Sequence, residues 1–93
     1  MTQEQLDAIL KELGVKPDKD GFLAMPEGTL LTLHVAHGGA SLAVTRVEAV
    51  RFESGIVYAR TPRREVYAFA RDDVYAAASD GGGTQTARRP GFG

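Results

Sequence analysis

The sequence predicts an α+β fold in which one N-terminal helix precedes a β-rich segment. Two observations predict it. Near the N-terminus, apolar residues recur at helical spacing and stop before Gly14. In the second half, three turn signals separate short apolar runs, and because Gly, Pro and Asp end strands for backbone reasons, they indicate an antiparallel meander. These turns are Glu53-Ser54-Gly55, Pro62-Arg63-Arg64-Glu65 and Arg71-Asp72-Asp73.

The length of 93 residues is enough for one domain with one core. We expect a single small globular domain at 1–79, with its helix at 2–13 and its strands within 29–79. The remainder, 80–93, contains Gly81-Gly82-Gly83 and has no apolar periodicity. It is therefore predicted to be a flexible Gly/Arg tail.

The formal net charge of −1 argues against a protein that bulk charge draws onto nucleic acid. All eight basic residues after residue 27 are Arg, against six acidic residues. The chain has no Cys, which excludes disulfides, thiolate metal sites and a Cys nucleophile. Because it shows no secretory signal and no apolar stretch near the ~20 residues that span a bilayer, we expect a cytoplasmic protein without a membrane partner.

The N-terminal helix is predicted to run to Leu13. Thr2 can cap it, and Gln5 follows three residues later, as in a capping box. Gly14 supplies a left-handed stop, and Pro17 prevents continuation. A helix this short needs a docking partner for its apolar stripe. The stripe consists of Leu6, Ile9, Leu10 and Leu13.

A connector over 16–28 follows the helix, and its apolar residues either pin it to the core or form a short edge strand. Thr29–Ala36 alternates and is predicted as the first main strand. The next predicted strand, Ser41–Phe52, is long, and its alternation breaks at Arg46. We therefore expect a bulge or bend near Thr45–Val47, through which this strand passes from one sheet layer to another.

Three shorter strands complete the predicted sheet, at Ile56–Thr61, Val66–Ala70 and Tyr75–Ser79. Arg71–Val74 is predicted as one 3₁₀ turn with Val74 pointing inward. A strand, a single tight turn and a short last strand resemble the end of an SH3-like barrel. The expected architecture is therefore a helix followed by a five-stranded antiparallel meander or SH3-like small barrel.

The two hairpin registers determine which side chains share a face. A first hairpin centred on Ser54-Gly55 places Arg51 opposite Tyr58. A second, centred on Arg63-Arg64 with a loop of two or four residues, places Tyr58 opposite Phe69 and Arg60 opposite Tyr67. Because side chains alternate along a strand, two faces separate. The aliphatic face carries Val50, Phe52, Val57, Ala59, Val66, Ala68 and Ala70. The other, here called the Tyr/Arg face, carries Arg51, Tyr58, Arg60, Tyr67 and Phe69.

The Tyr/Arg face suits stacking and cation–π contacts. The simplest interpretation is that the helix covers it, and the alternatives are a protein partner or second copy, or a nucleic acid. Arg63 and Arg64 at the hairpin tip extend it into a basic patch interleaved with aromatics, as single-strand binders use. The plainer interpretation of the tip is a solvated hairpin that Glu65 partly neutralises.

No catalytic or metal-binding constellation is legible. The two histidines, His34 and His37, have no Cys and no close acidic neighbour in sequence, whereas zinc needs three or four converging ligands. No nucleophile, base and orienting group form a set. Adjacent Asp72 and Asp73 point apart and suit a turn start. We therefore predict no catalytic residue, no metal and no cofactor.

Together these observations predict a non-enzymatic interaction module that binds a protein partner or itself through the Tyr/Arg face and the Arg-rich hairpin. The alternative is a nucleic-acid-binding small β-barrel that uses the same surface, and an enzyme or enzyme subunit of unknown reaction ranks third. No particular small molecule is indicated. The candidate binding residues are Arg51, Tyr58, Arg60, Arg63, Arg64, Tyr67 and Phe69.

Overall fold

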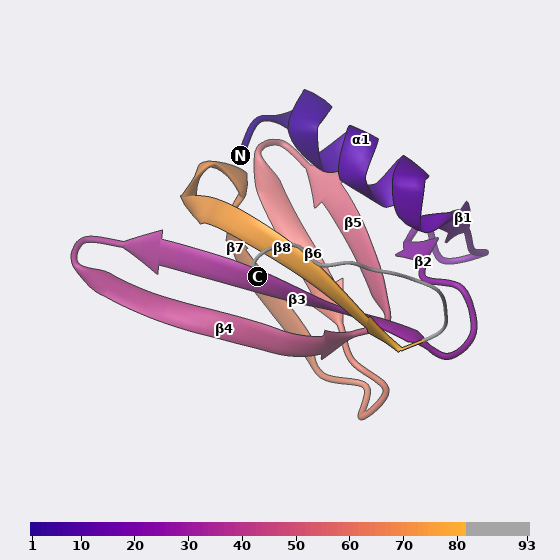
Figure 1. The fold of residues 1–93 in the computed structure, drawn as a ribbon. Helices are drawn as coiled ribbons and strands as arrows, with labels where there is room; N and C mark the ends of the chain where they lie inside the picture. The colour runs from indigo at the N-terminus through magenta and orange to yellow at the C-terminus, as the bar shows by residue number, and fades with distance from the viewer. Residues whose placement is uncertain (82–93) are drawn as a thin grey trace.

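The computed structural model describes residues 1–81, which form one helix and two antiparallel sheets (Figure 1). A five-stranded sheet has the order β1-β2-β5-β6-β7, and a three-stranded sheet has the order β4-β3-β8. The elements are α1 (Gln3–Leu13), β1 (Lys16–Pro17), β2 (Leu23–Ala24), β3 (Thr29–His37), β4 (Ala40–Val47), β5 (Ala49–Glu53), β6 (Ile56–Arg60), β7 (Val66–Ala70), the 3₁₀ helix η1 (Arg71–Asp73) and β8 (Val74–Gly81).

This arrangement confirms the α+β class and corrects the SH3-like barrel, because both sheets are open. The last strand, β8, pairs with β3 and not with β7, so β7 keeps a free edge. The described residues form eight strands where five were expected. The connector supplies two short strands, β1 and β2, and the long stretch after Ser41 divides into β4 and β5.

Helix α1 forms as its sequence predicts. The Thr2 hydroxyl accepts a hydrogen bond from the Gln5 backbone N–H at 3.1 Å, and the Gln5 side chain accepts one from the Thr2 N–H at 2.9 Å. Gly14 ends the helix with φ of 83°, a conformation that glycine adopts at little cost. The capping box at Thr2 and the left-handed Gly14 thus define the two ends of this short helix.

The core lies between the helix and the two sheets. Leu6 and Leu10 of α1 are each 2% exposed and belong to one apolar cluster with residues of both sheets. The sheet residues of that cluster include Leu31, Leu33, Val50, Val57 and Val74. The helix was expected to cover the Tyr/Arg face through Tyr58, Tyr67 and Phe69. Instead it packs mainly against the aliphatic residues of the sheets, and of those three aromatics only Phe69 packs against this cluster.

The predicted bulge joins the two sheets. Leu33 pairs with Val44, but Leu31 pairs with Val47, so β4 has one more residue than β3 between these pairs. Arg46 lies in this extra space with φ of 60°. The bulge bends the chain, and after Glu48 it continues as β5 in the other sheet. The prediction of a bulge and a change of layer is confirmed.

The first hairpin has the predicted register, and the second does not. Ser54 and Gly55 both have positive φ, as a two-residue loop requires, and Arg51 pairs with Tyr58. In the second hairpin Tyr58 pairs with Ala68, one residue away from the expected Phe69.

The cause of this shift is a loop with an odd number of residues. Thr61 donates its N–H to the Glu65 carbonyl at 2.9 Å, so three residues lie between this closing pair. The N–H of Arg64 bonds the Thr61 carbonyl at 2.9 Å, and Arg64 takes a left-handed φ of 66°. This is a turn followed by one left-handed residue, the usual form of a three-residue hairpin loop.

The shift moves Tyr67 and Phe69 to the other side of the sheet. Val57 pairs with Phe69, and Ala59 pairs with Tyr67, so both aromatics share the core side with Val57 and Ala59. Phe69 packs against the core cluster. The Tyr/Arg face therefore does not exist as one surface: Arg51, Tyr58 and Arg60 stay together, and the two other aromatics leave them.

Strand β8 is longer than expected. It includes Asp80 and Gly81, which pair with Leu30 and Thr29, because its partner strand β3 begins at Thr29. These two residues were assigned to the tail, and the rest of that predicted tail, 82–93, lies outside the described residues. Within residues 1–81, no helix has the length and apolar character needed to cross a membrane.

Candidate interaction surface

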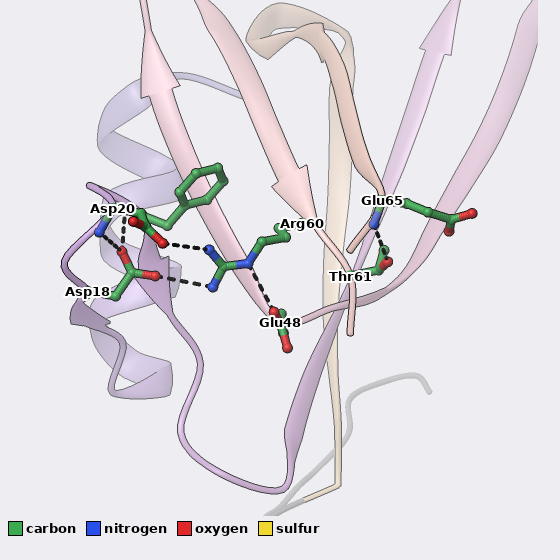
Figure 2. Close-up of polar contacts among 7 residues, drawn as sticks. Asp18, Asp20, Glu48, Arg60, Thr61 and Glu65 are labelled. Atoms are coloured by element: carbon green, nitrogen blue, oxygen red, sulfur yellow. Dashed lines mark hydrogen bonds and ion pairs between the residues drawn. The ribbon is translucent and has the colours of Figure 1, made fainter. Parts of the chain in front are cut away.

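The outer side of the larger sheet gathers charged side chains around Arg60 (Figure 2). The Arg60 Nε donates to the Glu48 carboxylate at 2.9 Å, and Nη2 donates to Asp18 at 3.1 Å. Asp20 lies 3.8 Å from Nη1. Three carboxylates, two from the connector turn and one from the link between β4 and β5, therefore surround one guanidinium group, whose planar array of donors can serve several acceptors at once.

The connector turn that carries Asp18 is built around its carboxylate. Asp18 Oδ1 accepts hydrogen bonds from the backbone N–H groups of Asp20 at 2.8 Å and Phe22 at 2.9 Å. Desolvation alone would raise the pKa of Asp18, but these two bonds and the Arg60 guanidinium outweigh it and lower that pKa below its ordinary value of 3.8. Asp18 is thus held ionised beside Arg60.

Aromatic rings complete this cluster. The Arg51 guanidinium lies 4.2 Å from the centre of the Tyr58 ring and 5.6 Å from that of Phe22, and Arg60 lies 4.8 Å from the Phe22 ring. Arg51 also forms an ion pair with Glu53. Both guanidinium groups are therefore occupied within the chain, among four carboxylates. We call this set the Arg60 cluster: Asp18, Asp20, Phe22, Glu48, Arg51, Glu53, Tyr58 and Arg60.

A second surface lies where β4 meets the β6–β7 hairpin (Figure 1). A groove of about 240 Å³ opens there. We call it the β4 groove, and it is lined by Leu42, Ala43, Val44, Thr45, Arg46, Thr61, Arg63, Glu65 and Tyr67.

The two walls of the β4 groove differ in kind. Five consecutive residues of β4, from Leu42 to Arg46, line one wall. Because successive side chains point to opposite faces of a sheet, a consecutive run can line a groove only along the edge of a strand. The hairpin contributes every second residue, from Thr61 to Tyr67, so it presents a face. The groove thus brings a free strand edge against a side-chain surface.

Exposed apolar side chains border this groove. Leu42 is 57% exposed and Tyr67 is 41% exposed, and both line it. Exposed apolar side chains that gather at one depression are more informative than the same residues scattered over a surface.

The guanidinium groups at the groove are not paired with carboxylates as those of the Arg60 cluster are. Arg46 and Arg63 line it, and Arg64 adjoins Arg63. Within residues 1–81, none of these three guanidinium groups forms an ion pair of 4.0 Å or less. The acidic residue of the groove, Glu65, accepts a long hydrogen bond from the Tyr67 hydroxyl at 3.4 Å. The groove therefore has an excess of positive charge.

The structure divides the seven candidate residues among three places. Arg51, Tyr58 and Arg60 lie in the Arg60 cluster, and Phe69 packs against the core. The remaining three, Arg63, Arg64 and Tyr67, lie in or beside the β4 groove. The candidate residues predicted from the sequence did not include Leu42 or Arg46. By alternation Leu42 shares a face with Val44, which is buried, so its exposure does not follow from the sequence pattern. The break in alternation at Arg46 was the available signal that side chains change direction there.

The histidines take no part in either surface. His37 lies 3.1 Å from the Asp73 carboxylate, and the centre of the His34 ring lies 5.9 Å from that of Tyr75, with the two rings tilted by 45°. In the described part of the chain, no three His, Cys, Asp or Glu residues converge as they would around a metal ion.

No protein-family model matches this chain, and neither the curated proteins nor the solved structures contain a significant match to it. The function of this chain is therefore inferred from the two surfaces themselves.

Proposed function

We propose that this chain is a non-enzymatic interaction module that binds a protein partner in the β4 groove. The observation that carries the proposal is the meeting of three features in one depression. It has a free strand edge along β4, exposed apolar side chains at Leu42 and Tyr67, and guanidinium groups at Arg46 and Arg63. Protein interfaces combine such apolar and Arg anchors with a polar rim.

The Arg60 cluster has a structural role in this proposal. Its guanidinium groups already have carboxylate and aromatic partners, so a ligand would have to displace Asp18 or Glu48 to reach Arg60. Breaking partly buried charge-assisted hydrogen bonds is costly. Of the seven candidate residues, binding is therefore assigned to Arg63 and Tyr67 in the β6–β7 hairpin.

Selection of short random peptides displayed on a surface tests this proposal. Peptides that bind the protein should lose most of their binding to Tyr67→Ala, because Tyr67 lines the groove. The matched control is Tyr75→Ala, which removes a still more exposed tyrosine, at 59%, that does not line the groove. Peptides that bind all three proteins equally, or a selection that yields none, would contradict the proposal.

Nucleic acid remains the second candidate, because Arg46 and Arg63 line the same groove as the exposed Tyr67, and Arg64 adjoins Arg63. A labelled single-stranded oligonucleotide distinguishes it. Phosphate contacts make affinity fall steeply with salt, and Arg63→Ala combined with Arg64→Ala should then reduce the slope. Such a result would favour the nucleic-acid candidate over the peptide, and absence of binding at low salt would remove it.

A further inference from the structure

We infer that the partner segment in the β4 groove is an extended strand that joins the β4 edge of the smaller sheet and places an acidic side chain near Arg46 and Arg63. This inference rests on the proposed function and specifies the chemistry of its ligand. It follows from the backbone of β4, from the composition of that strand, and from the charge of the opposite wall.

One side of strand β4 is paired with no other strand among residues 1–81. It is the terminal strand of the order β4-β3-β8, and in the part of the chain that the structure describes its ladder runs along β3 alone. Among residues 1–81, no hydrogen bond outside that ladder involves the backbone of Ser41–Thr45. Half of the backbone donors and acceptors of this stretch therefore point away from β3 into the groove region.

The geometry of the turn before β4 shows which residues direct their backbone groups away from β3. Gly38 and Gly39 have φ of 59° and 86°, the signature of a two-residue type I′ hairpin loop, and His37 pairs with Ala40 across it. In such a loop the flanking pair is hydrogen-bonded, and hydrogen-bonded pairs then alternate with non-bonded ones. Ser41 and Ala43 consequently direct their N–H and C=O groups outward.

The composition of β4 does not protect this edge. From Ala40 to Thr45 the strand has no charged residue and no proline, which are the usual means of preventing edge pairing. By contrast, β1, one of the two terminal strands of the larger sheet, has only two residues, Lys16 and Pro17. An uncharged edge beside an exposed apolar groove is suited to strand addition, in which the backbone gives affinity and alternate side chains give specificity.

The opposite wall determines which side chains fit. It presents Arg63 and Tyr67, while Arg46 closes the far end of β4. Two guanidinium groups against one Glu65 favour a carboxylate of the ligand, and Leu42 with Tyr67 favours apolar side chains beside it. The same charge argues against a second copy as the occupant, since two such grooves would bring like charges together.

The experiment uses the peptides selected above and two N-methylated versions of each. One version carries methyl groups on its odd amides, and the other on its even amides. In an added strand only one set of amides faces β4, so one version should lose about tenfold or more in affinity while the other stays within about twofold. Equal losses from both versions would overturn strand addition and leave groove binding intact.

Amide exchange gives an independent readout on the protein. Bound peptide should slow exchange at the Ser41 and Ala43 amides, which face the groove. Peptide binding that depends on Tyr67 but leaves both amides unprotected would also overturn strand addition. If both amides are protected without peptide and light scattering gives the mass of two chains, a second copy occupies the edge, and the inferred partner strand is wrong.

The acidic side chain is tested by charge reversal. Arg63→Glu should weaken binding of an acidic peptide about tenfold, and a Lys in place of the peptide's acidic residue should restore it. The matched control is Arg64→Glu, which changes a neighbouring charge outside the groove lining. Equal effects of the two reversals would show that overall charge, and not the groove, selects the peptide.

Discussion

Arg60 shows how one side chain can join segments far apart in the sequence. It bonds to the connector at Asp18 and to the start of β5 at Glu48, and it lies over the ring of Phe22. Its side chain is only 24% exposed, so its ion pairs are screened less than those at a free surface. This explains why a residue that looks like a binding arginine in the sequence serves the fold instead.

Replacement of Arg60 by Ala should lower the free energy of unfolding by about 2 kcal/mol, because three carboxylates lose their common partner and Phe22 loses its covering cation. Urea denaturation measures this change. Arg63→Ala, which removes an exposed arginine without an ion pair in the described residues, is the control and should stay within about 0.5 kcal/mol. Equal effects of both substitutions would show that the Arg60 cluster does not stabilise the protein.

The lowered pKa of Asp18 predicts a dependence of stability on pH. Since the folded carboxyl has a lower pKa than the unfolded one, its contribution is complete above the unfolded value near 3.8 and is lost as pH falls through the folded pKa. Urea midpoints of the wild type and Asp18→Asn should therefore converge at acid pH. Asn keeps an acceptor for the turn and removes the charge, so parallel curves across acid pH would contradict this origin.

Two arginines, Arg46 and Arg64, have left-handed φ values of 60° and 66°, where glycine is preferred. Arg64→Gly and Arg46→Gly should each raise the free energy of unfolding by up to about 1 kcal/mol, because the cost of a left-handed side chain exceeds the extra entropy of glycine. Arg46→Gly should at the same time weaken peptide binding, since Arg46 lines the groove. A loss of stability in both variants would be the opposite result.

At the scale of elements, the β6–β7 hairpin decides where the aromatics lie. Its three-residue loop places Phe69 on the core side and leaves Ala68 on the outer side, beside Tyr58. A loop of two or four residues would have exchanged them. One residue in a loop thus determines whether Tyr67 contributes to the β4 groove or to the Arg60 cluster.

Paired substitutions test this register. Phe69→Ala should lower the free energy of unfolding by about 2 kcal/mol, less than a fully buried Phe because Phe69 is only partly buried. Ala68→Glu, at an exposed position, should change it by less than about 0.5 kcal/mol. Thermal unfolding of both variants measures these changes. A larger loss of stability from Ala68→Glu than from Phe69→Ala would favour the register expected from the sequence.

At the scale of the whole molecule, the features that could be predicted from the sequence are those that depend on residues close together in the chain. Helix α1, the bulge at Arg46, the first hairpin and the 3₁₀ turn at 71–73 all follow from caps, turns and broken alternation within a few residues of each element. The closing of a barrel could not be predicted in this way, because it depends on whether distant strands meet. Here β8 pairs with β3, and the sheets stay open.

The same dependence on distant residues explains why the candidate site could be predicted only in part. Which arginines are occupied depends on the connector turn at Asp18, which lies 42 positions from Arg60 in the sequence. The position of Tyr67 depends on the parity of one loop. Residue types indicated a surface with Arg and Tyr, but only the three-dimensional arrangement separates the neutralised Arg60 cluster from the β4 groove.

The left-handed conformation of Arg46 in the bulge of β4 has a consequence for the evolution of this chain. Every arginine codon becomes a glycine codon through the change of a single base, so a residue that adopts the left-handed conformation at position 46 at lower cost is always one mutation away. If binding in the groove is what selection maintains, related chains that keep the function should keep arginine there despite its cost. Glycine at that position would then mark lineages in which the edge of β4 no longer has a partner.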